Sequence, residues 1–203
     1  MREPFIVKIC GITNEQDARA AVESGANALG FNFWPGSPRC ISAGRAAEIG
    51  NTVAGDYLKV GVFVDAPEAE VQDVTVQVGL DVLQLHGECS VRGADRRIWR
   101  AVAAGDGVPL SDDCVEAWLL DSVAQHGGSG KSFDWKLAAR FPHRAIIAGG
   151  LDASNVAEAI QIASPWGVDA CSRLEMAPGK KDAQKVRAFI QAAIAALEHE
   201  MAL

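Results

Sequence analysis

The sequence has no pair of cysteines in the CxxC spacing, although it contains five cysteines in 203 residues. An odd count without this spacing argues against a disulfide framework and against a structural zinc site. We therefore expect the protein to work in a reducing, cytoplasmic environment. The five cysteines are Cys10, Cys40, Cys89, Cys114 and Cys171.

Long apolar runs and an excess of positive charge are also missing. No stretch approaches the length of a membrane span, and the run 5–9 is too short and too early for a signal peptide. The formal net charge is −7 and the pI is about 5.1, which argues against nucleic acid or an anionic membrane as the main partner. An anionic small molecule is compatible with this balance, because it meets a local pocket rather than the global charge.

No linker, low-complexity tract or domain boundary interrupts the chain, so we expect a single catalytic domain over residues 1–203. Hydrophobic residues make up 49% of the sequence, enough for a sizeable core without metals or disulfides. The length lies at the lower end of what a parallel barrel needs.

Short β-type runs alternate with helical stretches along the whole chain. Strands are predicted over 5–10, 27–33, 58–64, 82–85, 98–102, 117–120, 145–148 and 167–171. Helices are predicted over 14–24, 42–53, 133–141 and 154–163, after Pro67, and after Asp182. The predicted N-caps are Thr13 or Asn14, Ser42, Ser154 and Asp182, and Gly25 should end the first helix.

This alternation predicts an α/β fold in which helices cover a parallel sheet. About eight strand–helix units are present, the number that a closed barrel requires. We therefore predict a single (β/α)8 TIM barrel with eight parallel strands, compact because the helices after strands four and five are short. The alternative is an open doubly wound sheet, but no dinucleotide fingerprint follows the first strand.

Active residues of such barrels lie at the carboxyl ends of the strands and in the loops that follow. This rule selects a set of polar residues and glycines from the predicted strand ends. They are Lys8, Cys10, Asn32, Asp65, His86, Asp121, Gly149, Gly150, Ser172 and Arg173.

Cys10 ends the first predicted strand. A thiolate can remove a carbon-bound proton if its pKa is brought near neutral. Lys8 has the same side-chain parity, so both should point inward, where the ammonium would favour the thiolate. The alternative is that Cys10 is a small buried apolar residue, as most free cysteines are. We give that second interpretation to Cys40, Cys89, Cys114 and Cys171.

Asp121 directly follows the apolar sixth strand. A carboxylate there cannot fill a core at low cost, so it either caps a loop or works in a site. A carboxylic acid facing a thiolate across the barrel mouth would supply one acid and one base. That pair is what an aldose-to-ketose proton transfer needs.

Gly149 and Gly150 end strand seven, and Ser172 and Arg173 follow strand eight. Loops after these two strands commonly build the phosphate site of such barrels from backbone N–H groups. Paired glycines let the backbone approach a phosphate closely, and the alternative is a simple turn. The position in the strand order favours the phosphate.

Three further features keep more than one interpretation. Arg39 lies in a loop stiffened by two prolines and would suit a carboxylate, but the residues alone favour a solvated surface arginine. His86 either orients a neighbour or contacts substrate. The glycine-rich segment 126–131 is a mobile cover, a close backbone contact for a ligand, or a flexible connector.

Together these segments resemble the phosphoribosylanthranilate isomerase family over nearly the whole chain. The opening Lys-Ile-Cys-Gly-Ile and the Gln-Leu-His-Gly motif are its most specific parts. The matching segments are 8–13, 30–33, 37–39, 60–63, 84–87, 120–122, 127–130, 133–135, 148–151, 167–169 and 178–182.

The resemblance implies a cofactor-free and metal-free Amadori rearrangement in tryptophan biosynthesis. It converts N-(5′-phosphoribosyl)anthranilate, a phosphorylated aminosugar, to 1-(2-carboxyphenylamino)-1-deoxyribulose 5-phosphate. Carried over, Asp121 is the general acid and Cys10 the general base, while Arg39 holds the anthranilate carboxylate. The substrate-binding candidates are Lys8, Arg39, His86, Gly149, Gly150, Ser172 and Arg173. We expect a monomer or weak homodimer, with no nucleic-acid or membrane partner.

One departure concerns the expected phosphate loop. The family usually has Ser-Gly where this chain has Ser172-Arg173, and arginine disfavours a positive φ. Arg173 could supply a charge-assisted contact or narrow the site. Two rival functions are another phosphosugar isomerase on the same barrel and a barrel that binds a phosphorylated ligand without turnover. Cys10 argues against the first, whose members end strand one with aspartate, and only Arg173 favours the second.

Overall fold

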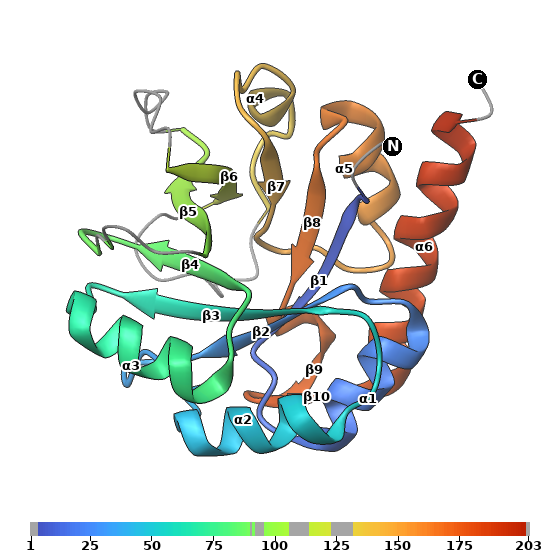
Figure 1. The fold of residues 1–203 in the computed structure, drawn as a ribbon. Coiled ribbons are helices and arrows are strands. Elements are labelled where there is room, and N and C mark those ends of the chain that lie inside the picture. The colour runs from blue at the N-terminus through green and yellow to red at the C-terminus, as the bar shows by residue number, and fades with distance from the viewer. Residues whose placement is uncertain (1–3, 90, 92–95, 106–113, 123–131, 202–203) are drawn as a thin grey trace.

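Eight parallel strands close into a barrel in chain order in the computed structural model, which describes residues 4–89, 91, 96–105, 114–122 and 132–201 (Figure 1). The strands are β1 (Ile6–Cys10), β2 (Ala28–Asn32), β3 (Leu58–Val64), β4 (Val82–His86), β5 (Arg97–Ala103), β6 (Val115–Asp121), β7 (Ala145–Ile147) and β8 (Gly167–Ala170). β8 pairs with β1 and closes the ring. The predicted TIM barrel is confirmed, and the open sheet is ruled out.

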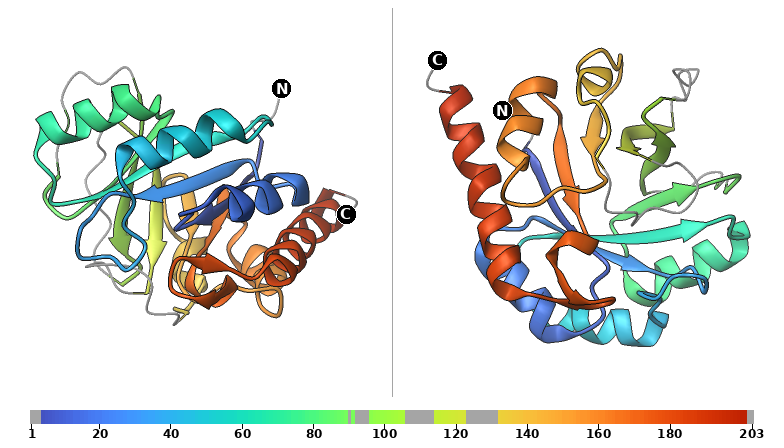
Figure 2. Two further views of the ribbon diagram at one scale, coloured as in Figure 1. Left: turned by 90° about the horizontal axis from the view of Figure 1, so that it is seen from below. Right: turned by 180° about the vertical axis from the view of Figure 1, so that it is seen from behind.

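The helices form an outer layer around the strands (Figure 2). They are α1 (Glu15–Ser24), α2 (Ala43–Thr52), α3 (Glu68–Val78), α4 (Lys136–Ala139), α5 (Val156–Ala163) and α6 (Ala183–Met201). No helix was predicted between β8 and α6, yet a 3₁₀ turn (Ser172–Leu174) and an antiparallel hairpin of β9 (Glu175–Ala177) and β10 (Lys180–Lys181) lie there. None of the helices in the described residues is long and apolar enough to cross a membrane.

Most predicted helix ends are found where the residues indicated. The Asn14 side chain accepts from the Asp17 N–H and begins α1, and Gly25 ends it in the left-handed region at φ 108°. The predicted cap at Ser154 is wrong. Its hydroxyl donates to Asp152 Oδ1 at 2.5 Å, and α5 begins only after Asn155.

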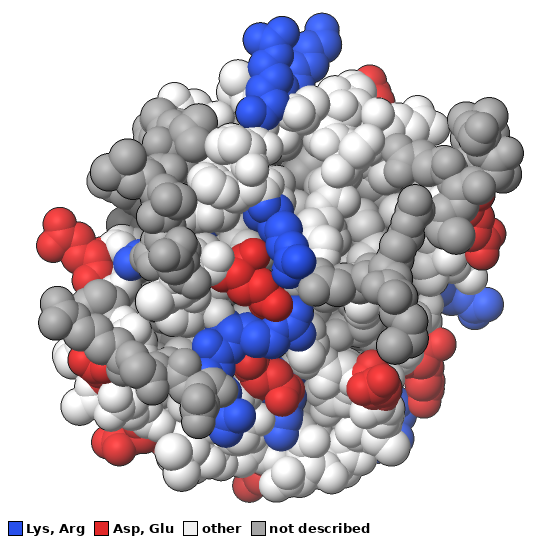
Figure 3. Space-filling model, turned by 45° about the horizontal axis from the view of Figure 1, so that its top comes forward, with Lys and Arg blue, Asp and Glu red and all other residues white. Residues whose placement is uncertain are grey.

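Short helices after strands four and five cannot be located in the described part of the chain. Residues 90, 92–95 and 106–113 lie outside it, and the described residues between β4 and β6 contain no helix. That prediction therefore stays a prediction. Charged side chains are mixed on the face drawn in Figure 3, and neither sign forms a continuous patch among the described residues there.

The apolar residues form two layers, because side chains on a strand alternate between its faces. One cluster fills the barrel, with Ile6, Trp99 and Leu119 among its members. The other lies between the strands and the helices, where Phe189 of α6 is fully buried. Since Ile6 points inward, the same parity directs Lys8 and Cys10 into the barrel.

We predict that Phe189→Ala lowers the free energy of unfolding by about 3–5 kcal/mol, because it removes a fully buried aromatic ring and leaves a cavity. Val76 of α3, a residue that is 82% exposed, provides the control. Val76→Ala should change stability by less than about 0.5 kcal/mol. Denaturant titration measures both values, and equal losses in the two variants would contradict this account of the core.

Candidate active site

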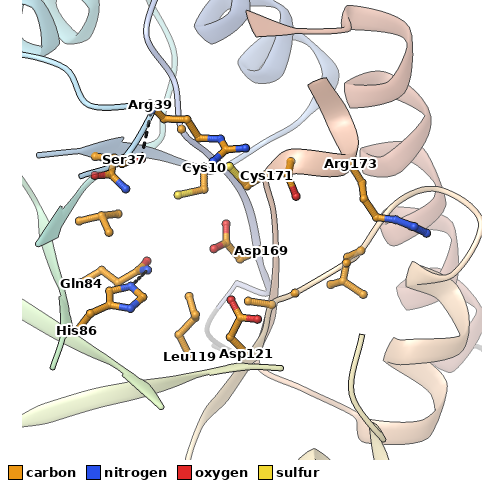
Figure 4. A pocket seen from close by; sticks show the side chains of 18 of the residues that line it. Cys10, Ser37, Arg39, Gln84, His86, Leu119, Asp121, Asp169, Cys171 and Arg173 are labelled. Carbon is orange, nitrogen blue, oxygen red and sulfur yellow. Dashed lines mark hydrogen bonds between the residues drawn. The ribbon is translucent and has the colours of Figure 1, made fainter. Parts of the chain in front are cut away.

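A pocket of about 720 Å³, including its open mouth, lies at the carboxyl ends of the barrel strands (Figure 4). Most of the residues selected from strand ends line this pocket, and so does Arg39. The lining residues from strand ends are Cys10, Asn32, His86, Asp121, Gly149, Gly150, Ser172 and Arg173. Lys8 and Asp65 are not in the lining.

Lys8 has no exposed surface, and it lies beneath the pocket rather than in its wall. Its ammonium donates to Asp169 Oδ2 at 2.9 Å, and Asp169 itself lines the pocket. Burial would lower the pKa of Lys8, but the negative charges of Asp169 and Cys10 outweigh it and raise the pKa above its ordinary value. Lys8 is therefore a fixed buried cation next to Cys10.

Cys10 is 8% exposed, and the pKa of its thiol is lowered to about 6. A hydrogen bond with Cys171 is the largest cause, and burial opposes it. The positive charge of Lys8, the cause suggested by the sequence, lowers the pKa by a smaller amount. At neutral pH the group is thus a thiolate in a pocket, which is the form that accepts a proton.

The other cysteines fall into different surroundings. Cys171 lines the pocket beside Cys10, so its assignment as a small buried apolar residue is wrong (Figure 4). Cys40 and Cys114 are exposed, so the same assignment is wrong for them too. Cys89 is buried outside this pocket, as expected.

Asp121 lies at the end of β6, 6% exposed, and lines the same pocket as Cys10. Its Oδ1 accepts from the backbone N–H of Ser122 at 2.6 Å. The two interpretations offered for this residue are therefore compatible, because the carboxylate both holds the start of the loop and reaches the cavity. In Figure 4, the Asp169 side chain lies between Cys10 and Asp121.

Arg39 is held by Glu175 of β9, so it is not a solvated surface arginine. Its Nε and Nη2 donate to the two carboxylate oxygens at 2.8 Å and 2.7 Å. Lys181 Nζ donates to the same carboxylate at 2.9 Å. Burial raises the pKa of Glu175, but these two cations lower it below its ordinary value. The hairpin thus fixes a guanidinium at the pocket wall.

The glycine loop after β7 has backbone angles that L side chains rarely adopt. Gly149 and Gly150 have φ of 78° and 64°. The Asn155 side chain donates to the Gly150 carbonyl at 2.8 Å and holds the loop in place. Arg173, by contrast, is not among the described residues with positive φ, so an arginine is accommodated there without backbone strain. Its Nε donates to Asp152 Oδ2 at 2.9 Å.

Gln84 and His86 form a second polar wall on β4. The Gln84 Nε2 and His86 Nε2 atoms are 3.0 Å apart, and both side chains are almost fully buried. The sequence rule missed Gln84 because it considered strand ends only. Residues two positions earlier on the same face also reach the cavity, and Asp169 on β8 is another of these. The segment 126–131 lies outside the described residues.

The chain is similar to known proteins over almost its entire length. A model of the family described as N-(5'phosphoribosyl)anthranilate (PRA) isomerase matches residues 7–192. The N-(5'-phosphoribosyl)anthranilate isomerase of Solibacter usitatus is 49% identical over 201 residues, covering 95% of this chain and 99% of that protein. The corresponding protein of Pelobacter propionicus is 44% identical over 197 residues, covering 92% and 94%.

Solved structures agree with this similarity. The phosphoribosyl anthranilate isomerase of Thermus thermophilus superposes with a TM-score of 0.84 at 35% identity, covering 95% of this chain and 99% of that one. The enzyme of Thermotoga maritima gives 0.83 at 36% identity, covering 95% and 100%. A further structure, with reduced 1-(o-carboxyphenylamino)-1-deoxyribulose 5-phosphate bound, gives 0.79 at 34% identity, covering 95% and 100%.

We predict that alkylation of Cys10 by iodoacetamide is half-maximal at about pH 6, because the reactive form is the thiolate. Cys40 supplies an internal control, since burial raises the pKa of its thiol above the ordinary value. Mass spectrometry of the labelled peptides follows both sites in one experiment. A Cys10 profile that coincided with that of Cys40 would contradict the assigned electrostatics.

Proposed function

The chain belongs to the N-(5'-phosphoribosyl)anthranilate isomerase family, and we propose that Cys10 and Asp121 are the general base and general acid of its reaction. The reaction converts N-(5′-phosphoribosyl)anthranilate to 1-(2-carboxyphenylamino)-1-deoxyribulose 5-phosphate in tryptophan biosynthesis. It is an Amadori rearrangement, in which an aldose-derived amine becomes an aminoketose without gain or loss of atoms.

Two proton transfers, one from Asp121 and one to Cys10, lead to the enolamine from which the product forms. Asp121, protonated, gives its proton to the ribose ring oxygen, and the C1′–O bond breaks as the nitrogen lone pair forms a Schiff base. The Cys10 thiolate then takes the proton from C2′, and the electrons of that bond neutralise the iminium as an enolamine. Tautomerisation of the enolamine, in which the 2′-hydroxyl loses a proton and C1′ gains one, gives the ketone.

The observation that carries this proposal is that Cys10 and Asp121 open onto one pocket. They come from β1 and β6, so they approach a bound sugar from different walls. A pKa of about 6 supports Cys10 as the base, because the thiolate predominates at neutral pH. Lys8 acts on this site through its charge and through Asp169 rather than by touching substrate.

Arg39 is the proposed partner of the anthranilate carboxylate. Glu175 uses the Nε hydrogen and one Nη2 hydrogen, which leaves the other edge of the guanidinium for a second carboxylate. Because Glu175 fixes the plane of the group, little side-chain freedom is lost when substrate binds. His86 is a candidate substrate contact on the β4 wall of the pocket.

The phosphate is proposed to bind where the β7 and β8 loops meet. Gly149 and Gly150 line the pocket there, and their lack of side chains allows a close approach of backbone N–H groups. Ser172 adds a hydroxyl, and Arg173 adds a cation at the rim that Asp152 already engages. This arrangement suits a charged group that is partly open to water.

We further propose a single catalytic domain over residues 1–203 that works in the cytoplasm without a cofactor. The cytoplasmic setting follows from a thiolate base that must stay reduced. The expectation of a monomer or weak homodimer also stays a proposal. A structure from Thermotoga maritima is described as generated monomers of a dimeric phosphoribosylanthranilate isomerase.

We predict that Cys10→Ala and Asp121→Asn each lower kcat by at least about a hundredfold, because each removes a proton-transfer group. Loss of substrate fluorescence measures turnover, and the melting transition should stay close to that of the parent protein. Cys89→Ala, which removes a buried thiol outside the pocket, is the matched control. Turnover near the parent rate in either site variant would refute the role given to that residue.

Arg39→Lys should raise KM by about tenfold to a hundredfold while kcat changes little. A lysine ammonium lacks the planar set of donors that lets the arginine hydrogen-bond to the substrate carboxylate and to Glu175 at the same time. Arg45 of α2, which pairs with Glu48 on the surface, gives the control substitution Arg45→Lys. Steady-state kinetics separate the two parameters. An unchanged KM for Arg39→Lys would show that the carboxylate binds elsewhere.

A further inference from the structure

Cys10 ends β1, and Cys171 directly follows the neighbouring strand β8 at the same height in the barrel. The register of β1 against β8 pairs Lys8 with Asp169 and Ile9 with Ala170. The next residues along the two segments, Cys10 and Cys171, therefore lie opposite each other. Both thiols line the pocket, and Figure 4 shows them side by side. A pair of ionisable groups this close is expected to titrate as a unit rather than independently.

Lys181 of β10 determines which way the Cys171 thiol can point. Its buried ammonium donates to the Cys171 carbonyl at 3.2 Å and to Cys171 Sγ at 3.6 Å. A sulfur that accepts a hydrogen bond on one side must direct its own hydrogen elsewhere. The Cys171 side chain shares a hydrogen bond with Cys10, whose sulfur is the acceptor left for the Cys171 hydrogen.

We propose that Cys171 is a positioning residue for this reaction, whose thiol donates a hydrogen bond to the Cys10 thiolate and keeps it ready to accept a proton from carbon. The inference rests on the proposed role of Cys10 as the base. Cys171 touches neither reacting atom in this scheme, and it keeps its proton throughout.

The charged groups near the pair act on both thiols, and Lys181 and Arg39 lower the pKa of Cys171 without outweighing its hydrogen bond to Cys10 and its burial. Cys10 has the fixed cation Lys8 on its own strand. The shared hydrogen bond raises the pKa of Cys171, and burial raises it further. The charged or titratable groups acting on Cys10 are Lys8 of β1, Asp169 of β8, Cys171, Lys181 of β10 and Arg39 of the loop after β2.

In this arrangement the two thiols have different roles, with Cys10 as the base and Cys171 as the hydrogen-bond donor. If both sulfurs were ionised, their like charges would repel each other at the pocket wall. With one proton between them, the second thiol supplies a donor that is compact enough to fit beside the sugar. A donor that stays protonated also leaves the thiolate as the only base of the pair.

The test is the pH profile of Cys10 in variants at position 171. Cys171→Ala and Cys171→Gly lack the donor, so the half-maximal pH for Cys10 alkylation should rise by at least about one unit, a tenfold change in the ionisation constant. The acidic limb of kcat/KM should move by the same amount, because it reports the base of the free enzyme. Cys171→Ser, which retains a donor, should restore both profiles most of the way.

Cys89→Ala is the control, since it removes a buried thiol that hydrogen-bonds to the Ala66 carbonyl instead. It should leave both profiles in place. If the two folded donorless variants keep the parent profile, or if Cys171→Ser behaves as they do, the inference is overturned. Should one donorless variant not fold, the other carries the test.

The outcome distinguishes this inference from the function on which it rests. If Cys10→Ala is inactive but the donorless variants titrate normally, Cys10 remains the base and only the role of Cys171 fails. If Cys10→Ala turns over normally, the base has been misassigned. In that case the alkylation profile alone still reports whether Cys171 acts on Cys10.

Discussion

The buried ion pair between Lys8 and Asp169 is the interaction on which the site depends. It joins the first and last strands of the barrel, where the two residues face each other in register at a distance of 2.9 Å. A lysine without exposed surface is tolerated only if its charge is matched, and removal of one partner from such a pair costs about 3–5 kcal/mol. The pair therefore stabilises the junction between β1 and β8, and it places one positive and one negative charge near Cys10.

The hairpin after β8 extends this arrangement outward. Glu175 and Lys181 are nearly inaccessible to water, and each is satisfied by partners that line or touch the pocket. Through Glu175 the hairpin fixes Arg39, and through Lys181 it fixes Cys171. The proposed anthranilate end and the proposed proton-transfer end of the site are thus held by one short structural element.

The barrel fold and many of the pocket residues could be predicted from the sequence, because the spacing of apolar residues and the alternation of strands and helices indicate a (β/α)8 barrel. The rule that chemistry lies at strand ends selected Cys10, Asp121 and the Gly149–Gly150 pair, all of which line the pocket. Strand parity also placed Lys8 inside the barrel.

What the sequence could not supply was contact between distant segments. Cys171 was predicted to be a small buried apolar residue, because no neighbouring residue in the sequence indicates that it lies beside Cys10 where β8 pairs with β1. Arg39 looked exposed because its partner, Glu175, lies 136 positions away. The hairpin itself is only five strand residues long, too short for a periodic signal. Ser154 was misread because Asp152 competes for its hydroxyl, a choice that local propensity does not decide.

The sequence separation between β1 and β8 has a consequence for biosynthesis. Cys10, the proposed base, is synthesised well before Asp169, Cys171 and Lys181. Lys8 and Asp169 are 161 positions apart, so the growing chain carries an uncompensated lysine until β8 emerges and docks. A nascent chain that stops before Gly167 therefore has the Cys10 thiol but lacks Asp169, Cys171 and Lys181, which act on its pKa. The Cys10 thiol therefore acquires its charged neighbours from the far end of the chain only when β8 pairs with β1.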